Sequence, residues 1–192
     1  WQSQWVELDP EQVSKMKARQ GVPYTVSRQM AVIDQETGLP VVRDGRSIGE
    51  VVMRGNNVML GYYQDPEATA LAFRDGWFHS GDLAVVHPDG YMQIVDRVND
   101  GIVRAGATIP STEIEEIIYR HPEVLEVAVV ATPDPLQGEV PKAFVMMKDG
   151  ATLSEGELID FCRRQGSELL APAIVEFGQL PKTATGKTMK AR

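Results

Sequence analysis

The hydrophobic pattern of this 192-residue chain changes near Asn99, and the change divides the sequence into two modules. Before Asn99, short alternating runs separated by turns predict β-strands. These runs cover residues 25–33, 48–53, 83–87 and 91–95. After Asn99, helical and strand patterns mix in the way typical of a small sheet with helices packed on it. We therefore expect an α+β fold, with a β-rich subdomain over residues 1–98 and a small α+β domain with a mixed sheet and packed helices over residues 99–192.

Local signals predict the helices and strands of the second module. Thr112 and Glu115 have the spacing of a capping box, which predicts a helix start. Ser154 and Glu157 have the same spacing and predict a second helix that runs to about Arg164. Strands are expected at residues 124–131, 140–147 and 173–177.

The first module has turn and helix signals of its own. Asp65-Pro66-Glu67 predicts a short helix with proline in its first turn, ending near Asp75-Gly76. Pro88-Asp89-Gly90 separates two alternating runs and predicts a β-hairpin. Residues 1–20 predict either a short amphipathic helix or a surface segment.

Charge and apolar content argue against two classes of protein. The formal net charge of −8 argues against nucleic-acid binding, because that function needs a basic face that releases counterions from phosphates. No run approaches the roughly 18 apolar residues of a membrane-spanning helix, and the N-terminus has no signal-peptide character. Because the chain begins at Trp1 without a methionine, we expect it to be an excised piece of a longer protein.

The chain has a single cysteine, Cys162, so an intramolecular disulfide is impossible. Such cysteine usage favours a reducing compartment, and we expect a cytoplasmic location. Cys162 lies among apolar residues that include Leu158 and Phe161, which favours a buried core position over a nucleophile.

The tail of the chain contains a Gly-Lys-Thr triplet at residues 186–188, as do the phosphate loops of nucleotide triphosphatases. That motif needs a glycine five residues before the second glycine, where this chain has Pro181. Proline has no backbone N–H to donate, so we reject the phosphate-loop interpretation. What remains is a loop that presents Lys187, whose long stem suits it to neutralise a phosphate or carboxylate. The alternative is an ordinary solvated lysine.

Two charged residues near the end of the first module are candidate binding groups. Asp82 lies on a glycine-bounded turn and could accept hydrogen bonds from two adjacent hydroxyls, such as those of a ribose, or could simply cap the turn. Arg97 follows a predicted strand and precedes the change of pattern, as expected for a residue at a domain junction. The alternative for Arg97 is a surface ion pair with Asp96 or Asp100.

Ordered short motifs extend over nearly the whole chain. They are Gly49-Glu50-Val51, Arg54-Gly55-Asn56, Gly61-Tyr62-Tyr63, Gly81-Asp82-Leu83, Asp96-Arg97, Glu113-Ile114-Glu115, His121-Pro122, Pro133-Asp134, Gly138-Glu139, Pro181-Lys182-Thr183 and Thr185-Gly186-Lys187. Their order and spacing resemble the C-terminal part of the adenylate-forming, AMP-binding superfamily, which contains acyl-CoA synthetases, luciferases and peptide-synthetase adenylation domains. Residues 17–21 and 76–82 most resemble fatty acyl-CoA ligases and short- or medium-chain acyl-CoA ligases.

The resemblance implies a piece of an AMP-forming acid–thiol ligase. Members activate a carboxylic acid, here expected to be a fatty acid, with ATP to form an acyl-adenylate and pyrophosphate, and then transfer the acyl group to coenzyme A. A large N-terminal body holds ATP with Mg, and a small C-terminal lid rotates between the two half-reactions. Residues 1–98 would be the β-rich end of that body, and residues 99–192 the mobile lid.

The resemblance also implies roles for five residues. Asp82 corresponds to the aspartate that binds the ribose, and Arg97 to an arginine that contacts the nucleotide near the hinge. Asn99 is at the hinge position, and Gly106 is where the pantetheine arm of coenzyme A approaches the backbone. Lys187 corresponds to the lysine that bridges carboxylate and phosphate during adenylation, and it is also a candidate for acetylation by a lysine acetyltransferase. No metal ligand is expected among these residues.

Two departures from the family pattern concern the thioester-forming face. Asn99 stands where relatives have aspartate or lysine, and Ala105-Gly106-Ala107-Thr108 stands where they have Gly-Gly-Glu-Asn. The family's phosphate-binding loop, adenine-binding segment and acyl pocket would all precede Trp1. We therefore expect the chain alone to have no ligase activity.

Three other functions are compatible with the same motifs. The first is a stand-alone lid that regulates or complements a separate body. The second is an adenylation domain that loads a carrier protein. The third is a structural domain with decayed chemistry, which the retention of Asp82, Arg97 and Lys187 disfavours.

Overall fold

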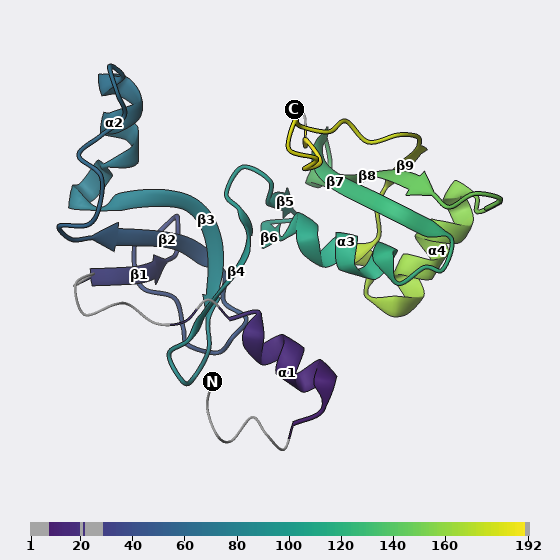
Figure 1. Ribbon diagram of the computed structural model, residues 1–192, viewed down its shortest axis with the longest axis horizontal. Coiled ribbons are helices and arrows are strands. Elements are labelled where there is room, and N and C mark those ends of the chain that lie inside the picture. The colour runs from purple at the N-terminus through teal and green to yellow at the C-terminus, as the bar shows by residue number, and fades with distance from the viewer. Residues whose placement is uncertain (1–7, 20, 22–28, 191–192) are drawn as a thin grey trace. The chain divides into compact units, whose positions relative to one another are not determined.

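The computed structural model describes residues 8–19, 21 and 29–190 (Figure 1). The chain folds as two compact units, Trp1–Val98 and Asn99–Arg192. Each unit has its own β-sheet and its own cluster of buried apolar residues. With two largely antiparallel sheets and few helices, the chain has the α+β fold that the sequence predicts.

The sheet of the first unit is a four-stranded antiparallel meander in the order β1-β2-β3-β4 (Figure 1). Its strands are β1 (Gln29–Ile33), β2 (Gly49–Arg54), β3 (Phe78–Val86) and β4 (Met92–Arg97). The predicted hairpin is present, closed by a hydrogen bond of 2.8 Å from the His87 N–H to the Tyr91 carbonyl. Val32, Val51 and Ala84 are buried on one side of the meander. Residues 25–28, the beginning of the first predicted strand, lie outside the described residues.

The first unit also contains two short helices whose starts are set by aspartate caps. Helix α1 (Pro10–Lys17) begins with a capping box between Asp9 and Gln12, so a short helix is present in the region where the sequence predicts either a helix or a surface segment. Helix α2 (Pro66–Ala72) begins at the Asp65 cap. It ends earlier than predicted, and a 3₁₀ turn, η2 (Arg74–Gly76), follows it. The reason is local, because Phe73, with φ −110° and ψ 50°, has already left the α-helical region.

The second unit contains a mixed sheet of five strands. They are β5 (Ile102–Arg104), β6 (Ala107–Ile109), β7 (Val124–Asp134), β8 (Gly138–Met147) and β9 (Ile174–Phe177), in the order β6-β5-β8-β7, with β9 parallel to β8. The sequence did not predict the β5–β6 hairpin, because strands of three residues are too short to show an alternating pattern. Its turn consists of Ala105 and Gly106, with φ values of 51° and 80°. Two consecutive positive φ values are typical of a tight hairpin turn.

Helices α3 (Ser111–Tyr119) and α4 (Glu155–Gln165) lie on one side of this sheet (Figure 1). A short 3₁₀ helix, η3 (Glu168–Leu170), precedes β9. The helices and the sheet share one apolar cluster, in which Ile114, Ile118 and Leu158 are fully buried. Within the described part of the chain, no helix has the length and apolar character that crossing a membrane requires.

One of the two predicted capping boxes is present and the other is wrong. The Ser154 N–H donates to the Glu157 carboxylate at 2.9 Å, and the hydrogen bonds from Ser154 lower the pKa of Glu157. At α3, by contrast, Pro110 occupies the cap position and no side chain caps the helix. The Glu115 carboxylate instead accepts a hydrogen bond of 2.8 Å from the backbone N–H of Val129 in β7. A tertiary contact has therefore replaced the local one.

Candidate functional site

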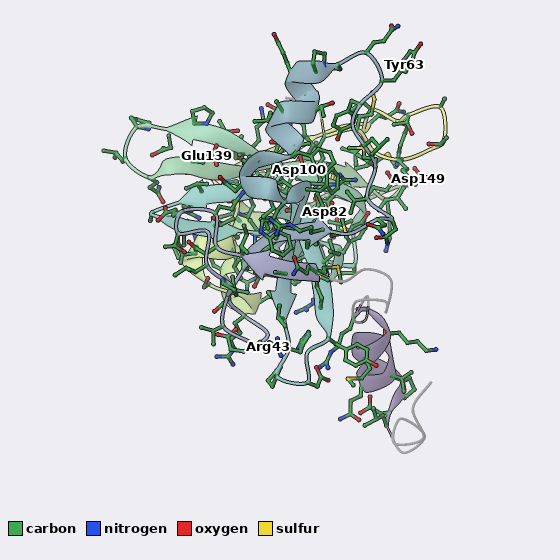
Figure 2. All side chains as sticks on the ribbon, turned by 90° about the vertical axis from the view of Figure 1, so that its left-hand side faces the viewer. Arg43, Tyr63, Asp82, Asp100, Glu139 and Asp149 are labelled. Atoms are coloured by element: carbon green, nitrogen blue, oxygen red, sulfur yellow. The ribbon has the colours of Figure 1, made fainter. Side chains whose placement is uncertain are left out.

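Asp82 and Arg97 form an ion pair in the first unit. They face each other in the register of β3 and β4, and Arg97 Nε lies 3.1 Å from Asp82 Oδ1. Figure 2 labels Asp82 on the ribbon. The Asp82 side chain is 30% exposed and the Arg97 side chain 67% exposed, so a ligand could reach both. The sequence named Asp96 and Asp100 as alternative partners for the arginine, but the strand register selects Asp82.

A buried carboxylate, which sequence reasoning did not single out as functional, supports the turn before Asp82. Glu50 is 3% exposed, and its Oε2 accepts a hydrogen bond of 2.9 Å from Arg74. The same oxygen lies 2.9 Å from His79 Nδ1, and Oε1 accepts a longer bond of 3.3 Å from the Gly81 N–H. Glu50 therefore fixes the backbone that precedes Asp82. The sequence could have identified Glu50 by its position among the apolar residues of β2. A carboxylate at such a position is expected to be buried, and a buried carboxylate needs compensating partners.

Asn99 and Gly106 belong to the second unit, and both are exposed. Asn99 is the first residue of that unit and immediately follows Val98, the last residue of the first. Gly106 lies at the tip of the β5–β6 hairpin with a φ of 80°, and a Cβ added there would meet no atom within 4 Å. Within this chain, glycine is therefore favoured by the backbone conformation of the turn rather than by a lack of space.

Lys187 lies near the tip of a small hairpin formed by residues 181–189. The Thr183 N–H donates to the Lys187 carbonyl at 2.8 Å, and the Lys187 N–H donates to Thr183 Oγ1 at 3.1 Å. Gly186 takes the positive φ, 82°, that the turn requires. Lys187 is exposed, as expected, and its ammonium group has no hydrogen-bond or ion-pair partner among the described residues. It is available to a ligand.

The five candidate residues divide between the two units. Asp82 and Arg97 lie in the first, whereas Asn99, Gly106 and Lys187 lie in the second. Among residues 8–19, 21 and 29–190, no group of three or more histidine, cysteine, aspartate or glutamate side chains could hold a metal ion.

Cys162 is fully buried in α4, as the sequence predicts, and burial raises the pKa of its thiol to about 11. Because burial disfavours the thiolate, its fraction at pH 8 should be roughly 100-fold smaller than in an unfolded chain. We expect iodoacetamide at pH 8 to leave the native protein unmodified over a period in which the urea-unfolded protein is labelled to completion. Mass spectrometry measures both, and rapid labelling of the native protein would contradict the core assignment.

Comparison with known proteins agrees with the motifs. Residues 113–187 match the AMP-binding enzyme C-terminal domain. Over 99% of its length, the chain is 52% identical to 4-hydroxybutyrate–CoA ligase 2 of Metallosphaera sedula and 48% identical to the peroxisomal acetate/butyrate–CoA ligase AAE7 of Arabidopsis thaliana. It covers 34% of each relative, so the chain spans about a third of the curated relatives it matches.

Solved structures agree as well. ATP-bound MatB from Rhodopseudomonas palustris superposes with a TM-score of 0.75 at 34% identity, over 84% of this chain and 32% of that one. The o-succinylbenzoate CoA synthetase MenE of Bacillus subtilis, in complex with its acyl-adenylate, gives 0.76 at 28% identity, over 94% and 36%. The fold and the matched domain are those of adenylate-forming enzymes. Residues 113–187 thus match the C-terminal domain of AMP-binding enzymes, and the chain as a whole is similar to the C-terminal part of CoA ligases.

Proposed function

We propose that this chain is the C-terminal portion of an AMP-forming acid–thiol ligase, which converts a carboxylic acid, ATP and coenzyme A into an acyl-CoA, AMP and pyrophosphate. The main support from the structure is the exposed, unpaired Lys187 on a hairpin of the domain that the family model matches. The names of the relatives, which are CoA ligases, support the same reaction.

Lys187 acts in the first half-reaction. A carboxylate oxygen of the acid attacks the α-phosphorus of ATP, and the bond to pyrophosphate breaks. Two anionic groups must approach each other, and a cation placed between them lowers the cost of that approach. The Lys187 ammonium has the required charge, and its four-carbon stem has the required reach.

Asp82 and Arg97 hold the nucleotide. Asp82 accepts hydrogen bonds from the two ribose hydroxyls, because a carboxylate has acceptor sites left after one oxygen pairs with an arginine. Arg97 orients the aspartate through the 3.1 Å ion pair and adds positive charge near the phosphates. The backbone that Glu50 fixes keeps this pair in position.

The second half-reaction uses the other face of the lid. We propose that residues 99–192 rotate about Asn99 as a mobile lid against the body, of which residues 1–98 form the end. The exposed turn at Gly106 then faces the pantetheine arm of coenzyme A. Mg accompanies ATP in this reaction, and we assign none of its ligands to the described residues.

The acid is proposed to be short rather than a long-chain fatty acid. The relatives are named for 4-hydroxybutyrate, acetate or butyrate and, in Humulus lupulus at 46% identity, 2-methylpropanoate. The pocket that selects the acid would belong to the body. The cytoplasmic location and the acetylation of Lys187 by an acetyltransferase stay predictions. Two relatives from Arabidopsis thaliana, AAE7 and probable acyl-activating enzyme 5, are named as peroxisomal.

A graft tests the proposed function. In this grafted ligase, the chain replaces the aligned third of 4-hydroxybutyrate–CoA ligase 2 of Metallosphaera sedula. We expect the graft to form 4-hydroxybutyryl-CoA from ATP, 4-hydroxybutyrate and coenzyme A, and to catalyse ATP–pyrophosphate exchange.

Two controls accompany the graft: the chain alone and the ligase body alone. Neither should form acyl-CoA, because each lacks half of the groups that the reaction needs. Acyl-CoA formation by the purified chain, or a folded graft that forms no acyl-adenylate, would contradict the proposal.

A further inference from the structure

We propose that Lys190 and Glu115 are positioning residues that anchor the base of the Lys187 hairpin, so that Lys187 is presented from a fixed place during adenylation. This inference rests on the proposed adenylation role of Lys187. Lys190 lies three residues after Lys187, whereas Glu115 comes from α3, far away in the sequence.

The anchor is a compact polar cluster. Lys190 Nζ lies 2.8 Å from Glu115 Oε1 and donates a hydrogen bond of 2.6 Å to Ser111 Oγ. The same Glu115 oxygen accepts the backbone N–H of Val129 at 2.8 Å, which attaches the cluster to β7. The Lys190 and Glu115 side chains are only 20% and 15% exposed. Solvent and salt therefore screen this pair less than a surface ion pair.

A second anchor holds the other side of the hairpin. Lys182 pairs with Glu126 of β7 and also donates to Thr188 Oγ1 at 3.1 Å. The Met189 N–H donates to the Pro181 carbonyl at 2.9 Å, which closes the base of the hairpin between the two anchors.

The three lysines of this segment therefore have different electrostatic roles. Lys182 and Lys190 each face a carboxylate, so their charges are compensated within the unit. Lys187 has no such partner among the described residues and keeps its charge for a ligand. Lys182 and Lys190 thus hold the hairpin, and Lys187 is left to bind the ligand.

Loss of the anchor would release Lys187. Without the Lys190 contact, the hairpin would keep its own hydrogen bonds but would be held to the unit on the Lys182 side alone, so its tip could tilt and displace Lys187. A misplacement of about 1 Å can reduce a rate by about 100-fold. The position of Lys187 thus depends on a contact that touches neither ATP nor the acid.

The test compares variants of the grafted ligase in each half-reaction. Lys190→Met should lower kcat for acyl-adenylate formation by about 10- to 100-fold, with KM for ATP changed by less than about threefold. Thioester formation from supplied acyl-adenylate and coenzyme A should stay within about threefold of the unmodified graft, because Lys187 serves adenylation alone. Lys190→Arg should restore adenylation, since it keeps the charge.

Two further variants separate the anchor from general effects of charge. Glu115→Gln removes the charge but keeps an oxygen that can accept the Val129 N–H, and it should slow adenylation as Lys190→Met does. Glu176→Gln is the matched control, because Glu176 forms a 2.6 Å ion pair with Lys142 in the same unit and forms no hydrogen bond or ion pair with the described residues of the hairpin. Its adenylation rate should be unchanged.

A structural measurement on the isolated chain completes the test. In the unmodified chain, ¹⁵N relaxation should show residues 184–186 as ordered as the rest of the second unit. Lys190→Met should lower their heteronuclear NOE, whereas Glu176→Gln should not.

The outcomes are distinguishable. Full adenylation activity in Lys190→Met, combined with its loss in Lys187→Ala, would overturn the anchor and leave the proposed function intact. Equal loss of both half-reactions without rescue by Lys190→Arg would also overturn it, because that pattern indicates general destabilisation. Full adenylation in Lys187→Ala would instead remove the proposed function on which the anchor rests.

Discussion

Lys187→Ala is expected to slow acyl-adenylate formation in the grafted ligase by about 100- to 1,000-fold, the effect of removing one preorganised charge-stabilising group from an active site. The reason is that the lysine contributes where negative charge accumulates, as carboxylate and phosphate approach each other. The ammonium has no internal partner among the described residues, so its removal leaves no buried carboxylate unpaired. The loss should therefore appear in the reaction rather than in stability.

ATP–pyrophosphate exchange measures the first half-reaction, and supplied acyl-adenylate with coenzyme A isolates the second. We expect the second to change by less than about threefold, because its chemistry involves no attack on phosphorus. Arg120→Ala is the charge-matched control, since Arg120 is exposed just after α3 and its removal changes the net charge equally. An equal effect of Lys187→Ala on both half-reactions would contradict a specific role in adenylation.

Asp82→Asn is expected to raise KM for ATP by about 10- to 100-fold, which corresponds to the loss of one hydrogen bond to a charged group. The amide has the shape of the carboxylate but only one acceptor oxygen, and it has no charge to hold Arg97. One substitution would therefore weaken both the ribose contact and the orientation of the arginine, which lies 3.1 Å away.

The steady-state dependence of adenylation on ATP concentration measures this effect. Asp89→Asn is the matched control. Asp89 belongs to the same unit, but its 2.7 Å ion pair is with Arg19 and does not involve Asp82 or Arg97. It should leave KM for ATP unchanged. Equal KM values for Asp82→Asn and the unmodified graft would show that Asp82 does not bind the nucleotide.

Signals confined to a few consecutive residues were sufficient to predict several structural elements. The Ser154–Glu157 capping box, the helix start at Asp65-Pro66 and the turn between β3 and β4 all form as predicted, because each depends on contacts between residues at most a few positions apart. Burial of Cys162 followed in the same way from the apolar spacing of α4.

Other features depend on residues that are distant in the sequence. The Thr112–Glu115 capping box does not form. The Glu115 carboxylate instead accepts a hydrogen bond from the backbone of β7 and pairs with Lys190. The β5–β6 hairpin is too short to leave a pattern, and the role of Glu50 depends on His79 and Gly81, contributed by another strand.

For this protein, the amino-acid sequence alone determined the α+β fold class, most helix starts and the identity of the charged residues that a ligand could meet. Only the tertiary structure decided which of those charges are paired. Strand register joined Asp82 to Arg97, and contacts over 56 residues or more tied Lys182 and Lys190 to β7 and α3 while leaving Lys187 exposed. The physical reason is that caps and turns are satisfied by neighbouring residues, whereas an ion pair depends on where folding brings two distant side chains.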